Sequence, residues 1–65
     1  MELLTQYNYE KKWLNTTHKD ALDMISAEMP ETDAKGTLEY ILLQIQKGKI
    51  VTLGSCKFKS NLINN

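Results

Sequence analysis

The sequence contains no arginine, one cysteine, one proline and one histidine. The single cysteine, Cys56, cannot form an internal disulfide, which excludes a disulfide-stapled secreted scaffold and favours a reducing, cytoplasmic setting. No apolar run approaches the roughly 20 residues that a membrane-spanning helix needs, so we expect no membrane association. Arginine is the side chain best suited to bidentate contacts with guanine, and its absence argues against sequence-specific reading of DNA.

The reactive side chains are too few for a metal site or a catalytic centre. A structural zinc site needs four ligands of the cysteine and histidine type, whereas this chain offers Cys56 and His18. The acids lack the spacing and the glycine of a calcium-binding loop, and there is no glycine-rich phosphate loop. Cys56 and His18 would also be the only nucleophile and base of this type, and neither has a flanking motif. We therefore expect a protein that is not an enzyme and takes no metal or cofactor.

The 65 residues are enough for one small domain, residues 1–65, with a marginal core. Self-association is common at this size, so a homodimer is one expectation. The net charge is zero, but the charges are separated along the chain. Six acids lie between Asp20 and Glu39, where the only base is Lys35, and four lysines lie between Lys47 and Lys59 with no acid among them.

Apolar spacing predicts an α+β fold that is mostly α. Leu3, Tyr7 and Leu14 recur at helical spacing, which predicts a first helix. Thr17 is suited to cap a second helix that ends before Pro30. A third, strongly apolar helix follows and ends at Gly48, and alternating residues after it predict a C-terminal β-hairpin. The predicted elements are helices at about 3–14, 18–28 and 33–47, followed by strands at about 49–53 and 56–60.

Aromatic and acidic side chains are the candidates for a protein-binding surface. Tyr7 and Trp13 either cover the small core or anchor a partner, because Tyr and Trp are enriched at interface hot spots. The acids of the middle segment either form a solvated helix face or meet a basic patch on another protein. The candidate partner-binding residues are Tyr7, Trp13, Glu28, Glu31, Asp33 and Glu39.

Lysines in the C-terminal part are the candidates for nucleic-acid binding. Four of them, Lys47, Lys49, Lys57 and Lys59, could contact phosphates from the hairpin. The alternative is that lysines on edge strands prevent aggregation of the hairpin.

The passage Lys47-Gly-Lys-Ile-Val-Thr-Leu-Gly-Ser-Cys-Lys-Phe-Lys59 resembles the helix end, strand, turn and strand of the bacterial HU and integration-host-factor family. Thr17-His-Lys-Asp-Ala-Leu22 and Ala34-Lys35 are similar to the starts of its helices, so the resemblance covers about residues 17–60. The chain lacks the family's DNA-embracing arms. The resemblance implies an intertwined dimer with phosphate contacts through Lys19, Lys47, Lys49 and Lys57. It also implies a shared dimer core of Leu38, Ile41, Leu42, Ile45 and Phe58.

Two functions follow from these patterns. The first is a small regulatory protein that acts by binding another protein, and inhibition of that partner is one form that this action could take. The alternative is an HU-like protein that binds nucleic acid through its basic hairpin, with Lys19, Lys47, Lys49, Lys57 and Lys59 as the contacting residues.

Overall fold

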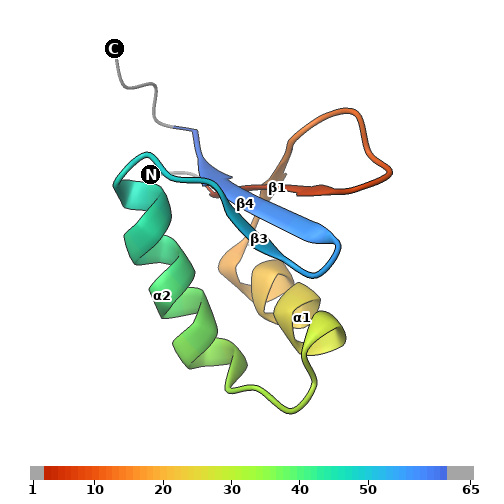
Figure 1. Ribbon diagram of the computed structural model, residues 1–65, viewed down its shortest axis with the longest axis vertical. Helices are drawn as coiled ribbons and strands as arrows, with labels where there is room; N and C mark the ends of the chain where they lie inside the picture. The colour runs from red at the N-terminus through yellow and green to blue at the C-terminus, as the bar shows by residue number, and fades with distance from the viewer. Residues whose placement is uncertain (1–2, 62–65) are drawn as a thin grey trace.

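The computed structural model describes residues 3–61, which form a four-stranded antiparallel sheet and two helices (Figure 1). The strand order in the sheet is β2-β1-β4-β3, so the first and last strands of the chain pair at its centre. The elements in chain order are β1 (Leu3–Tyr7), β2 (Leu14–Thr16), α1 (His18–Glu28), α2 (Ala34–Gln46), β3 (Val51–Leu53) and β4 (Cys56–Ser60).

The prediction of three helices followed by one hairpin is wrong, because residues 3–16 form an antiparallel pair of strands. Leu3, Thr5 and Tyr7 also fit the two-residue period of a strand, and a short apolar run does not distinguish that period from a helical one. The segment forms a strand rather than a helix because β1 pairs with both β2 and β4. The Thr5 and Thr16 hydroxyls lie 2.6 Å apart and join β1 to β2 across this pair.

The two helices begin and end at local sequence signals. The Thr17 side chain accepts a hydrogen bond from the Asp20 backbone N–H and caps α1, and Pro30 follows shortly after α1 ends. Gly48 follows α2 with a φ of 85°, the left-handed conformation that glycine adopts most easily at a helix C-terminus. Neither helix in residues 3–61 has the length and apolar character needed to cross a membrane.

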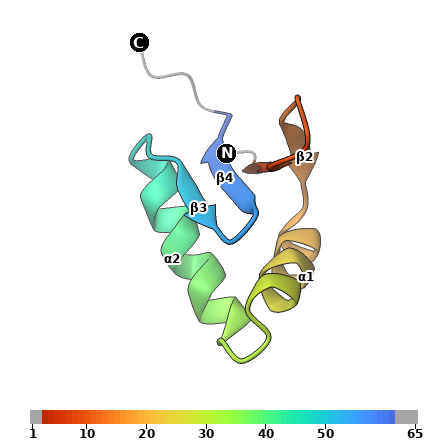
Figure 2. The same cartoon turned by 45° about the vertical axis from the view of Figure 1, so that its right-hand side comes forward.

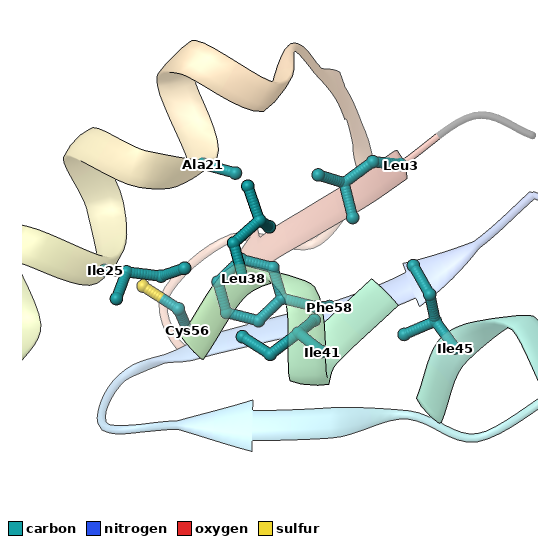
Figure 3. Close-up of a cluster of buried hydrophobic side chains, with 8 residues drawn as sticks. All are labelled: Leu3, Ala21, Ile25, Leu38, Ile41, Ile45, Cys56 and Phe58. Carbon is teal, nitrogen blue, oxygen red and sulfur yellow. The ribbon is translucent and has the colours of Figure 1, made fainter. Parts of the chain in front are cut away.

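The core lies between the helices and one face of the sheet (Figure 3). Phe58, at the centre of β4, is fully buried among side chains from both helices and from β1. These neighbours all come from a single chain. They include the residues that the HU resemblance assigns to a shared dimer core. Of those residues, Leu42 is half-buried. The buried apolar residues are Leu3, Ala21, Ile25, Leu38, Ile41, Ile45, Cys56 and Phe58.

Both helices cover the same face of the sheet, and the opposite face is left open. Side chains alternate between the two faces of a strand, so the burial of Leu3 and Phe58 against the helices places their neighbours Leu4 and Lys59 on the open face. The loop between β1 and β2 projects away from both helices (Figure 2). We call the open side, formed by Leu4, Gln6, Trp13, Asn15, Thr52, Lys57 and Lys59, the outer face.

We predict that Phe58→Ala removes a large part of the free energy of unfolding. Truncating a buried phenylalanine costs about 3–5 kcal/mol, while a chain of this length has a total free energy of unfolding of about 3–10 kcal/mol. Denaturant unfolding followed by circular dichroism measures the loss. The matched control is Tyr40→Ala, because the Tyr40 side chain on α2 is 59% exposed. Equal losses of stability in both variants would contradict the position assigned to Phe58.

Candidate functional site

Among residues 3–61, the outer face carries positive charge at its centre and no negative charge. Lys57 and Lys59 alternate with buried residues on β4, one of the two central strands. Their neighbours on the adjacent strands are Leu4 and Gln6 on β1 and Thr52 on β3. Within residues 3–61, neither lysine forms an ion pair with an acid.

Trp13 lies at the edge of the outer face, just before β2. The Lys59 side chain reaches across β1 and places its Nζ 4.4 Å from the centroid of the Trp13 ring. This cation–π contact at a half-exposed site is worth about 0.5–1 kcal/mol, since water still solvates the ammonium group. An aromatic ring and two lysines therefore share one open surface.

The separation of charge seen along the chain becomes a separation in space. All six acids from Asp20 to Glu39 lie on α1, on α2 or in the connection between them. In the rest of residues 3–61, the single acid is Glu10, against six lysines. These lysines are Lys11, Lys12, Lys47, Lys49, Lys57 and Lys59. The helical layer is thus acidic, and the strands with their loops are basic.

The structure does not bring the predicted partner-binding residues together. Tyr7 lies on the helix-facing side of β1 and stacks on Tyr9, with ring centroids 5.4 Å apart, whereas Trp13 lies on the outer face. The predicted acids all lie in the helical layer, where Glu31, Asp33 and Glu39 are exposed. One surface cannot therefore combine both aromatic residues with the acids.

The predicted nucleic-acid-binding lysines are also divided. Lys57 and Lys59 share the outer face, and Lys49 lies in the exposed segment that enters β3. Lys47 is the C-terminal cap of α2, and Lys19 lies in the first turn of α1. Lys11 and Lys12 lie in the loop between β1 and β2. They were not among the predicted nucleic-acid-binding residues, because a helix was predicted over residues 3–14. Trp13 between this lysine pair and β2 was the signal that could have pointed to them.

A second cluster of polar groups lies where the β3–β4 turn meets the end of α1. The Glu28 Oε1 atom accepts hydrogen bonds from the Ser55 backbone N–H at 2.5 Å and from the Ser55 hydroxyl at 2.6 Å. Gly54 has a φ of 59°, and a Cβ atom there would collide with the Glu28 carboxylate. Glycine is therefore favoured at this turn for its backbone conformation, and a side chain there would also displace the Glu28 carboxylate.

This cluster does not form a nucleophilic site. Burial is the main cause that raises the pKa of the Cys56 thiol, and the nearby Glu28 and Glu10 carboxylates act in the same direction. Burial also raises the pKa of Tyr7, beside Cys56. A thiol that is fully buried and protonated is a poor nucleophile. His18 is exposed at the start of α1 and is not among the groups that shift the Cys56 pKa.

In residues 3–61, no three His, Cys, Asp or Glu side chains are grouped so that they could hold a metal ion. The Glu28 carboxylate instead binds the β3–β4 turn, which gives it a structural role.

We predict that this role depends on pH. Hydrogen bonds from the Ser55 side chain and backbone lower the pKa of Glu28 below its usual 4.5. The carboxylate therefore stabilises the fold fully above about pH 4.5, and the stabilisation is lost as the pH falls through the lower pKa of the folded state. Glu28→Gln keeps an acceptor oxygen without the charge, so it should be less stable than the wild type at neutral pH and approach it in acid.

Denaturant unfolding at a series of pH values measures this difference in free energy. The matched control is Glu39→Gln, since Glu39 is exposed on α2 and makes no hydrogen bond within residues 3–61. A difference between wild type and Glu28→Gln that stays constant from neutral to acidic pH would contradict the role of the charge.

Comparisons with models of known families, with curated proteins and with solved structures give no match for this chain. The resemblance to the HU and integration-host-factor family therefore stays a prediction.

Proposed function

We propose that this protein binds nucleic acid through the outer face of its sheet. The observation that carries the proposal is the position of Lys57 and Lys59, side by side on a central strand of an uncovered face without an acid. Lysines that meet phosphates release condensed counterions, and this release is the main source of sequence-independent affinity for nucleic acids.

The charges around the outer face also favour a nucleic acid as the partner. Lys11 and Lys12, in the exposed loop next to Trp13, extend the positive charge beyond the strands. The acids lie in the helical layer, so a polyanion on the outer face would avoid most of their repulsion. The distribution of charge, and not the net charge of zero, is what favours this binding.

Binding of this kind would be largely independent of base sequence. The chain has no arginine, and lysine acts on phosphates as a point charge without the paired geometry that reads a guanine. We therefore propose a binder of the phosphate backbone rather than of a specific site.

Binding of a protein partner is a second candidate, and exposed residues of α2 favour it. Tyr40 and Leu43 lie about one turn apart and are 59% and 58% exposed, next to the exposed Glu39. Large exposed apolar groups with neighbouring acids suit a partner that has an apolar groove with a basic rim. This surface belongs to the helical layer, so it could operate independently of the outer face.

We predict that Lys57→Gln and Lys59→Gln each weaken binding of a single-stranded oligonucleotide by about fivefold to tenfold near 50 mM salt. Each substitution should also reduce the slope of log K against log salt by about 0.7, because one phosphate contact is lost. Fluorescence anisotropy of a labelled oligonucleotide at several salt concentrations measures both quantities.

The matched control for these variants is Lys35→Gln. Lys35 is an exposed lysine on α2, in the acidic layer, so its loss should leave the affinity within about twofold. If the wild type does not bind any oligonucleotide at low salt, or if Lys35→Gln weakens binding as much as Lys57→Gln, the proposed use of the outer face is wrong.

A further inference from the structure

We infer that the outer face selects single-stranded nucleic acid, because a base stacks on Trp13 in the place that the Lys59 ammonium group now occupies. This inference rests on the proposed function, since it names the class of nucleic acid and the contact that selects it. It adds an aromatic contact with a base to the phosphate contacts of the lysines.

Trp13 is placed for such a contact rather than for packing in the core. Core side chains come from the helix-facing side of the sheet, whereas Trp13 contacts Lys59, whose side chain lies on the opposite side. The ring is only half-buried, and the Lys59 Nζ covers it at 4.4 Å from the centroid. One face of the Trp13 ring is therefore covered by the flexible side chain of Lys59, which comes from another strand.

Displacement of the Lys59 ammonium group from the Trp13 ring by a base is favourable both for the ring and for the ammonium group. Stacking of a base on an aromatic ring is typically stronger than a half-exposed cation–π contact. The ammonium group that leaves the ring stays on the outer face, where it can pair with a phosphate of the same strand. Lys57, two residues away on β4, lies on the same face, where it can contact a neighbouring phosphate.

Single strands can stack a base on Trp13, and duplexes cannot. The bases of a single strand are free to leave their own stack and place a π-face on a protein side chain. The bases of a duplex are stacked and paired inside the helix, so the duplex offers only phosphates to a flat surface. The lysines alone would bind both forms, and Trp13 would supply the preference.

The test is a fluorescence titration of the full chain, in which Trp13 is the only tryptophan. The probes are oligo(dT), oligo(U), a DNA duplex of equal length and an abasic strand with the same number of phosphates. We expect the two single strands with bases to quench Trp13 fluorescence and to bind about tenfold more tightly than the abasic strand. The duplex and the abasic strand should bind with little quenching.

Trp13→Leu, with folding checked by circular dichroism, should lose about tenfold in affinity for oligo(dT) while its affinity for the duplex stays within about twofold. Trp13→Phe keeps a ring and should retain part of the preference. The matched control is Tyr40→Leu, which removes an exposed aromatic ring from the opposite layer and should change neither affinity.

Equal affinities for oligo(dT), the abasic strand and the duplex, without quenching, would overturn this inference and leave the proposed function intact. Binding of none of the four probes at low salt would overturn both. If Trp13→Leu does not fold, the quenching and the affinities of the wild type still decide between these outcomes.

Discussion

The antiparallel pairing of β1 with β4 is the constraint on which the rest of the structure depends. It joins Leu3–Tyr7 to Cys56–Ser60, and a further backbone hydrogen bond of 2.9 Å from Asn8 to Ser55 extends the pairing to the β3–β4 turn. Because the side-chain period of a strand is two, a shift of this pairing by one residue would exchange its two faces. The same register therefore buries Phe58 and leaves Lys57 and Lys59 on the outer face.

The pairing also explains how so small a chain closes a core. Two hairpins alone would be marginal, but their central strands meet and form one sheet that both helices can cover. Glu28 at the end of α1 then binds Ser55 in the second hairpin, which ties the helical layer to the sheet by a polar contact. Apolar packing and this carboxylate therefore both join the helical layer to the sheet.

Separation of charge between the two layers links the fold to the proposed function. Along the chain, the acids and the C-terminal lysines are consecutive blocks, and folding stacks these blocks as layers. The lysines of the N-terminal hairpin join those of the C-terminal hairpin because the two hairpins lie side by side in the sheet. An uncovered sheet face with an aromatic ring among lysines is a surface that suits the phosphates and bases of a nucleic acid.

Much of the local structure was predictable, since its signals are local. Helix α1 spans His18–Glu28 as predicted, and α2 spans Ala34–Gln46, within one residue of its prediction at each end. The caps at Thr17 and Gly48 act over a few residues of backbone, so they can be read without knowing the fold. Strand β4 likewise has the predicted bounds, because Gly54 marks its turn.

Residues 3–16 were not predictable by the same means. Their apolar residues fit both periods, and the partner that selects the strand, β4, lies about fifty residues along the chain. The placement of Trp13 beside Lys59, and therefore the candidate site, depends on that distant pairing.

The sequence by itself determined the helices, the C-terminal hairpin and the blocks of charge, because caps, turns and composition act locally. Only the tertiary structure decided that the N-terminal segment is a pair of strands and that Trp13 faces away from the core. The physical reason is that a strand gains its hydrogen bonds from a partner elsewhere in the chain, whereas a helix makes its own.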